Sequence, residues 1–296
     1  MKEETIISSL YPRNLVQVDD CFFDGERLYS TDSIVEGTHF LHSWSSPKDI
    51  ATKLVEANIS DIIASGGYPE FCFLNLGLSD YSKKKNWLLK FTKQFKFLLK
   101  KYKITLTGGD TFYSKFTSLS LTVVSKKIKK VIQRTGAKVG DKIFITGTVG
   151  LSYLGYKLLK EKKKPKDSLE KLAILRHLSP KSRIDLYNLL IQNFSISSMM
   201  DITDGLVQDL EKYSKVSKKH FVVYADKLPN WALLKEYLTP LEILTSGEEL
   251  ELVFTSSSFI PNNLAVEIGI VKEGKNISFF ESNQKIFISK KGFLHF

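Results

Sequence analysis

Apolar residues along the first half of the chain alternate between two kinds of segment. Short runs rich in Phe, Leu, Val and Ile are typical of strands, and longer segments with apolar residues three and four positions apart are typical of helices with one buried face. Ser46 and Pro47 precede the first such helix, and Gly66 and Gly67 end it. The expected strands are residues 27–31, 71–79, 104–107 and 118–125, and the expected helices are residues 47–65 and about 83–102.

The pattern becomes polar and glycine-bearing at residues 133–141, QRTGAKVGD. We take this stretch as a domain boundary, which predicts an N-terminal domain over 1–135 and a C-terminal domain over 136–296. A chain of 296 residues is long enough for two medium domains. The second half is expected to contain strands at 141–147 and in SSMMDI, FVVYAD, LELVFT, VEIGIV, ISFFE and KIFIS, with helices near 151–160, 169–177, 181–193 and from Gly205 to about 217. The predicted class is α/β or α+β.

Composition indicates an ordinary globular protein, with 43% hydrophobic and 25% charged residues. No window resembles a membrane span, and the first residues lack the apolar run of a signal peptide. Cys21 and Cys72 both lie in apolar runs and are expected to be buried thiols in a reducing compartment. We therefore expect a cytoplasmic protein without a membrane partner.

The formal net charge is +11, and lysines gather at 83–85, 126–130 and 160–166. Such runs are compatible with nucleic-acid binding. They alternate with turns and helix ends rather than with aromatic residues, so a solvated surface that attracts anionic substrates is the preferred interpretation, and no nucleic-acid partner is expected.

Six aspartates stand out because each lies at the end of an apolar or small-residue segment. Aspartates gathered at strand tips repel one another unless cations hold them together, and a ligand set of oxygen atoms alone suits Mg²⁺. Mg²⁺ commonly uses substrate phosphates as further ligands, which predicts a phosphate-bearing substrate. Each residue taken alone could equally be a turn former or a helix cap. The six are Asp20, Asp32, Asp61, Asp110, Asp201 and Asp204.

Known phosphate-binding motifs are absent. The nearest approach to a phosphate loop is Gly150-LSYL-Gly155, but Tyr156 stands where a lysine is required. His39 could contact a substrate phosphate, and Arg134 could clamp one, although both could be ordinary structural or surface residues. Glu248 precedes an apolar strand and could be a strand edge or part of the site.

Taken in order, several segments resemble the thiamine-monophosphate kinase family of the aminoimidazole ribonucleotide synthetase-like superfamily. They are DDCFF, STDSIVEGTHF, ANISDIIASGGYP, TGGDT, RTGAKVGDKIFITGTVG, DITDGLVQDL, SGEELEL and KGFLHF. The resemblance implies a two-domain α/β fold, a homodimer formed through the N-terminal sheet, and ATP-dependent phosphorylation of thiamine monophosphate to thiamine diphosphate with several Mg²⁺ ions.

The resemblance also implies a role for particular residues. ATP contacts fall on Gly109, Arg134 and Thr203, and substrate contacts on His39, Glu248 and Phe293. Asp61, Asp110 and Asp204 are expected to be catalytic. The implied metal ligands are Asp20, Ser30, Thr31, Asp32, Asp61, Asp110, Asp201 and Asp204.

The chain departs from the family pattern at Val18, at Thr203 and at Leu250, which replaces an aromatic residue expected near the substrate. Three alternatives remain: another ATP-using enzyme of the superfamily with a phosphorylated or amide substrate, a relative that only binds nucleotide, and a lysine-rich nucleic-acid-binding protein. A phosphate monoester acceptor is already mostly ionised at pH 7, so direct in-line transfer aided by Mg²⁺ needs no general base.

Overall fold

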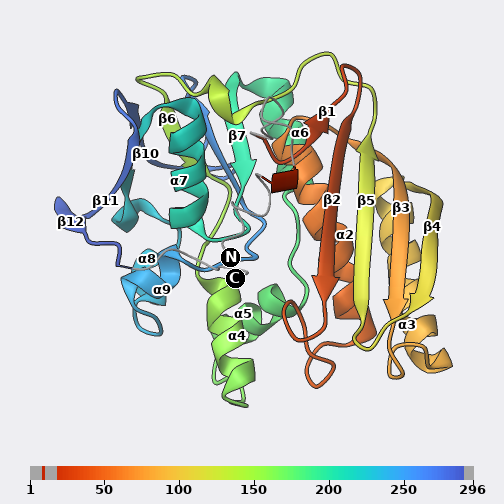
Figure 1. Ribbon diagram of the computed structural model, residues 1–296. Coiled ribbons are helices and arrows are strands. Elements are labelled where there is room, and N and C mark those ends of the chain that lie inside the picture. The colour runs from red at the N-terminus through yellow and green to blue at the C-terminus, as the bar shows by residue number, and fades with distance from the viewer. Residues whose placement is uncertain (1–8, 11–18, 290–296) are drawn as a thin grey trace.

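The computed structural model describes residues 9–10 and 19–289, and in that part of the chain each half contains its own β-sheet (Figure 1). The helices are α2 (Pro47–Ala64), α3 (Lys85–Tyr102), α4 (Leu151–Lys160), α5 (Ser168–Leu178), α6 (Ile184–Asn193), α7 (Leu206–Ser217), α8 (Trp231–Leu234) and α9 (Pro240–Leu244). The strands are β1 (Phe22–Phe23), β2 (Leu28–Val35), β3 (Pro69–Leu78), β4 (Thr105–Tyr113), β5 (Ser118–Ser125), β6 (Lys142–Ile145), β7 (Ile196–Asp201), β8 (His220–Tyr224), β9 (Leu252–Ser256), β10 (Val266–Lys272), β11 (Asn276–Glu281) and β12 (Gln284–Ile286).

The N-terminal sheet has the strand order β1-β2-β5-β3-β4. Strands β2, β5 and β3 are antiparallel neighbours, and β4 runs parallel to β3 at the edge. Figure 1 shows α2 and α3 together on one side of this sheet. All nine residues of β4 are exposed, so the opposite face and this edge are open to solvent in the single chain.

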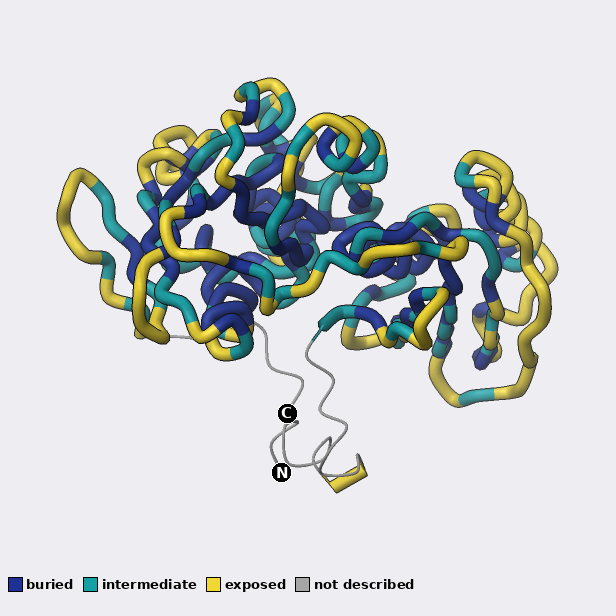
Figure 2. Tube along the Cα trace, turned by 90° about the horizontal axis from the view of Figure 1, so that it is seen from above, coloured by how far each residue is buried: buried dark blue, intermediate teal, exposed yellow. Residues whose placement is uncertain are grey.

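Helix α2 is the central element of the molecule. A capping box between Ser46 and Asp49 satisfies its first amides, and Pro47 begins it with a suitable backbone angle. Fourteen of its eighteen residues are buried, because it packs against the N-terminal sheet on one side and against β7 and α6 on the other. One continuous apolar core therefore joins the two halves, and Figure 2 shows buried segments in both of them.

The C-terminal sheet has the order β12-β11-β8-β10-β6-β9-β7, with α7 packed beside β8 and β11. A second apolar cluster lies between this sheet and helices α4, α7, α8 and α9. Strand β7 is the edge strand nearest α2, and its last residue is Asp201. This placement sets the carboxyl end of β7 against the N-terminal half.

The expected elements are present, with one consequential error. The strands expected over residues 27–31 and 104–107 end before Asp32 and Asp110. In the structure, β2 and β4 continue through these two aspartates. Full-length pairing with β5 and β3 provides the hydrogen bonds that extend them. Asp32 and Asp110 are thus strand residues rather than strand tips, and Asp61 lies inside α2.

Among the described residues, no helix combines the length and apolarity needed to cross a bilayer. Cys21 and Cys72 are free, buried thiols, as expected from their apolar surroundings. Val18, the KGFLHF segment and Phe293 lie outside the described residues, so their expected roles stay predictions.

Candidate active site

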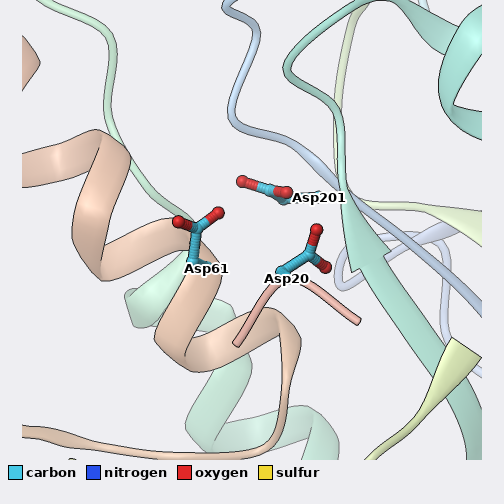
Figure 3. Close-up of side chains that lie close together, drawn as sticks. All are labelled: Asp20, Asp61 and Asp201. Atoms are coloured by element: carbon cyan, nitrogen blue, oxygen red, sulfur yellow. The ribbon is translucent and has the colours of Figure 1, made fainter. Parts of the chain in front are cut away.

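Three aspartates from distant parts of the sequence meet between the two halves. Asp20 lies in the turn before β1, Asp61 in the last turn of α2, and Asp201 at the end of β7. One carboxylate oxygen from each lies within 4.8 Å of the others, and Figure 3 shows the side chains around a common space. Asp61 and Asp201 are buried, and Asp20 is half-buried.

Strand β2 adds further oxygen atoms beside these carboxylates. The Ser30 hydroxyl donates to the Asp61 carboxylate at 2.5 Å. The backbone amide of Asp32 donates to the side-chain oxygen of Asn58 at 3.0 Å, which fixes β2 against α2. Asn58 and Asp61 share one side of α2, and both therefore face the strand that carries Ser30 and Asp32.

The electrostatics of this cluster favour a bound cation. Burial raises the pKa of Asp61 well above its usual value, and the charges of Asp32 and Asp201 raise it further. Burial likewise raises the pKa of Asp201 to about 6. Among the described residues, the buried Oδ2 atom of Asp201 has no hydrogen-bond partner. An unpaired buried acceptor in a set of oxygen ligands fits a hard divalent cation such as Mg²⁺.

Arg134, in the short 3-10 helix Arg134–Gly136, faces the same cluster. Its guanidinium is hydrogen-bonded and ion-paired to Asp20, and its backbone amide donates to Asp19 at 2.7 Å. The side chain is largely buried, with 12% exposure. A planar guanidinium beside a cluster of carboxylates that could hold a metal ion is suited to holding phosphate oxygens.

The loop between β7 and α7 carries Thr203 and Asp204. The carboxylate of Asp209 accepts hydrogen bonds at 3.0–3.1 Å from the backbone amides of Thr203, Asp204 and Gly205, which fixes the loop at the start of α7. Lys212 forms an ion pair with Asp204. Asp209 was not singled out from the sequence, although an acidic residue in the first turn of an expected helix is a recognisable capping signal.

His39 and Glu248 come from opposite halves and approach the same buried lysine. The Lys53 ammonium donates to the His39 carbonyl at 3.0 Å and to the Glu248 carboxylate at 2.8 Å. His177 Nδ1 lies 3.9 Å from the same carboxylate. Burial lowers the pKa of His177 to about 4, so this imidazole is neutral at physiological pH and does not form an ion pair. Neither Lys53 nor His177 was recognised in the sequence, because their neighbours come from distant segments.

Glu249 and Leu250 do not line the site. Glu249 is fully buried and accepts hydrogen bonds from the amides of Gly150 and Ser152 at 2.7 and 3.1 Å, so it caps the N-terminus of α4. In the phosphate-loop-like segment Gly150–Gly155, two backbone amides that could have bound a phosphate therefore donate to the Glu249 carboxylate. Leu250 is 2% exposed, so it packs in the interior of the C-terminal half. Glu248 precedes β9 and is not a strand edge.

Within one chain, Asp110 and Thr31 are not part of the cluster. Strand register places both on the open face of the N-terminal sheet, whereas Asp32 faces α2. Three strand spacings of about 4.8 Å separate β4 from β2, a distance of about 14 Å. The Thr31 hydroxyl is hydrogen-bonded to the Thr122 hydroxyl at 2.9 Å.

Gly109, with a φ of +151°, has to be glycine, because a Cβ there would lie 1.8 Å from the Leu74 carbonyl oxygen.

Comparisons with known proteins address the family. Two family models match: "AIR synthase related protein, N-terminal domain" over residues 19–126 and "AIR synthase related protein, C-terminal domain" over residues 138–280. Thiamine-monophosphate kinase of Leptospira interrogans serogroup Icterohaemorrhagiae serovar Lai (strain 56601) is 44% identical over 100% of this chain and 98% of its own length. The same enzyme of Aquifex aeolicus (strain VF5) is 32% identical over 99% and 95%.

Solved structures agree with the sequence relatives. A structure of AaThiL complexed with AMPPCP and TMP is 31% identical, covers 99% of this chain and 95% of its own, and superposes with a TM-score of 0.86. Hydrogenase maturation protein HypE in complex with ATP is 16% identical with a TM-score of 0.72, which shows a shared fold alone. The expected family and its two-domain α/β fold are thus confirmed, and the chain belongs to the thiamine-monophosphate kinase family of enzymes.

Proposed function

We propose that this protein transfers the γ-phosphoryl group of ATP to thiamine monophosphate, giving thiamine diphosphate, by direct in-line transfer assisted by several Mg²⁺ ions. The observation that carries the proposal is the meeting of Asp20, Asp61 and Asp201 between the two halves. The solved relative that binds AMPPCP and TMP supports the choice of substrates.

The acidic cluster would hold Mg²⁺. When bound, the ions would offset the repulsion between the triphosphate of ATP and the phosphate of thiamine monophosphate, which at about 4 Å amounts to about 4 kcal/mol per charge pair at an effective dielectric constant of 20. Asp20, Asp61 and Asp201 would supply carboxylates from three separate elements, and Asp32 and Ser30 of β2 are proposed as further ligands. The chain's own role is to fix these oxygen atoms in place before substrate arrives.

Cationic side chains beside the cluster would bind ATP. We propose that Arg134 holds phosphate oxygens. Lys212, on α7, forms an ion pair with Asp204, which lies in the same loop as Thr203. Because the phosphate-loop-like segment is capped by Glu249, the phosphates are expected at the acidic cluster rather than at the N-terminus of α4. Gly109 stays a proposed ATP contact.

The acceptor site is proposed around His39 and Glu248, with Phe293 as an aromatic contact. Glu248 can accept hydrogen bonds from an aminopyrimidine, and its side chain keeps 33% of its exposure. A phosphate monoester has a second pKa of about 6 and is largely dianionic at neutral pH. The acceptor oxygen is therefore already a nucleophile, and transfer needs orientation rather than proton removal.

A homodimer would bring Asp110 into the site. Within one chain this residue lies on the open sheet face, about three strands from β2. That face and its edge carry exposed Phe73 and Phe112, an apolar surface of the kind that a second copy would cover. A two-fold assembly through this face would set Asp110 of the partner subunit near Thr31, and each site would then be built from two chains.

The decisive experiment for the reaction is to incubate purified protein with ATP, Mg²⁺ and thiamine monophosphate and to follow thiamine diphosphate by chromatography. We expect stoichiometric ADP and thiamine diphosphate. Absence of product, or faster ATP use with a different phosphorylated or amide acceptor, would overturn the substrate assignment. A phosphorylated enzyme isolated after incubation with ATP alone would contradict direct transfer.

Complementation between inactive variants tests the shared site. Asp61→Asn and Asp110→Asn are each expected to be inactive, but co-refolded mixtures should recover about a quarter of wild-type activity, because half the dimers are mixed and each has one intact site. No recovery from a mixture shown to contain mixed dimers would place Asp61 and Asp110 in the same chain's site.

We also propose a cytoplasmic location, supported by the two free buried thiols and testable by cell fractionation.

A further inference from the structure

Lys53 is a buried cation that the metal and phosphate sites do not use. It lies in the second turn of α2, and its side chain is 5% exposed. Its ammonium donates to the carbonyl oxygen of His39 at 3.0 Å and to the carboxylate of Glu248 at 2.8 Å. These two partners are 209 positions apart in the sequence. One ammonium therefore joins the segment after β2 to the segment before β9.

The contact is one of several polar contacts along one side of α2. Asp49 and Glu56 lie four residues before and three after Lys53, so all three share a helix face. Asp49 accepts from the Ser179 hydroxyl at 2.7 Å, and Glu56 accepts from the amide and hydroxyl of Ser182 at 3.1 and 2.7 Å. These flanking bonds hold the two halves together independently of Lys53. The role of Lys53 is therefore separable from docking of the halves.

We propose that Lys53 is a positioning residue for the acceptor substrate, which fixes the Glu248 carboxylate and the His39 segment side by side so that the carboxylate can accept hydrogen bonds from the amine of an aminopyrimidine. This inference rests on the proposed function. It adds a residue that acts through Glu248 and does not itself contact the reacting phosphates.

The conformation of Glu248 shows why such a tether is needed. Its φ of +56° is in the left-handed region, which is unfavourable for a residue with a Cβ. Its amide donates to the Thr203 carbonyl at 2.7 Å, so the backbone is anchored while the side chain extends toward Lys53. The carboxylate keeps 33% of its exposure, which leaves it accessible to a ligand.

Lys53 also governs the charge of Glu248. Burial, the strongest influence, pushes the pKa of Glu248 upward, but the charge of Lys53, with smaller effects from His177 and His39, brings it below its usual value. In the part of the chain that the structure describes, Lys53 faces the carboxylate from α2, His177 from α5 and His39 from the segment after β2. His177 is neutral at physiological pH, because its pKa is lowered to about 4. Without Lys53, the effect of burial would dominate, and Glu248 would protonate at a higher pH.

The test is a pH series of steady-state kinetics on the full-length Lys53→Met variant. We expect KM for thiamine monophosphate to rise about tenfold or more at the acidic end of the series and to recover toward the wild-type value as pH increases, because a charged hydrogen bond is lost when the carboxylate protonates. KM for ATP should change less than about twofold. Lys53→Arg keeps the cation and should preserve the wild-type pH profile.

Lys142→Met is the matched control. Lys142 pairs with Glu267 at 3.2 Å within the C-terminal sheet, so this variant also removes a lysine from a Lys–Glu pair, at a place with no proposed role in the site. We expect wild-type kinetics. An equal rise of KM in both variants would show a general effect of charge loss and would overturn the inference.

A double-mutant comparison separates positioning from structural support. In a Glu248→Gln background the charge that Lys53 controls is absent, so adding Lys53→Met should change KM for thiamine monophosphate less than about twofold. This background also avoids an unpaired carboxylate if the single variant folds poorly. A further large rise of KM in that background, or an unchanged KM in Lys53→Met alone, would refute the inference. If the wild-type protein does not phosphorylate thiamine monophosphate, the proposed function fails by itself.

Discussion

Replacing Asp201 with asparagine should stabilise the metal-free protein while impairing its function. Asp201 is 1% exposed and ends β7 beside Asp61, with carboxylate oxygens within 4.8 Å. Asparagine has nearly the same shape as a protonated aspartate and carries no charge. The substitution therefore removes the buried charge without creating a cavity.

The magnitude follows from the raised pKa. Burial moves the pKa of Asp201 from 3.8 to about 6, and one pKa unit corresponds to about 1.4 kcal/mol, so keeping this group ionised in the fold costs about 3 kcal/mol at pH 8. The cost is negligible below about pH 4, grows as pH rises through about 6, and is constant above that.

Thermal unfolding in EDTA from pH 4.5 to pH 8 measures this difference. At pH 8 the variant should unfold about 5 °C above the wild type, and at pH 4.5 the difference should shrink to about a third of that. Mg²⁺ should raise the unfolding temperature of the wild type much more than that of the variant, because only the wild type retains the full ligand set. If Asp201→Asn unfolds at or below the wild-type temperature at pH 8 in EDTA, the cluster is not electrostatically strained.

Three further substitutions test other parts of the structure. Asp61→Asn should lower turnover by at least about tenfold while the circular dichroism spectrum is unchanged, and a near-normal rate would exclude a metal role for Asp61. Glu249→Ala should lower the free energy of unfolding by about 2–4 kcal/mol in urea, because it leaves the first amides of α4 unpaired, and no change would show that the cap is dispensable. Phe73→Asp on the open sheet face should shift sedimentation toward monomer. The control is Phe97→Asp on α3, where the Phe97 side chain is 60% exposed, and this variant should sediment like the wild type. Identical sedimentation of the two variants would argue against assembly through the open face.

Local patterns in the sequence predicted most of the elements. The apolar spacing and the capping signals around Ser46 and Pro47 gave α2 to within one residue of its observed bounds, because these signals act over a single helical turn. The acidic residues and their chemistry were also recognisable, since an all-oxygen set without histidine or cysteine favours Mg²⁺. The short helices α8 and α9 were missed because they contain too few residues to show a period.

Strand ends were harder to place. Asp32 and Asp110 look like strand tips in the sequence, but pairing with neighbouring strands carries β2 and β4 beyond them. Strand register then puts Asp110 on the face opposite Asp32. A side chain's face depends on pairing with distant strands, so the sequence could not assign it.

By itself, the sequence determined the alternation of helices and strands, the family and the oxygen-rich chemistry of the site, because each is encoded in short segments. Which of those residues meet depends on how the folded segments pack. Asp20, Asp61 and Asp201 converge because α2 packs against β7. Lys53, on the same helix, donates hydrogen bonds to His39 and Glu248 from the two halves. Such contacts arise from packing of segments far apart along the chain, and no local pattern of residues specifies them.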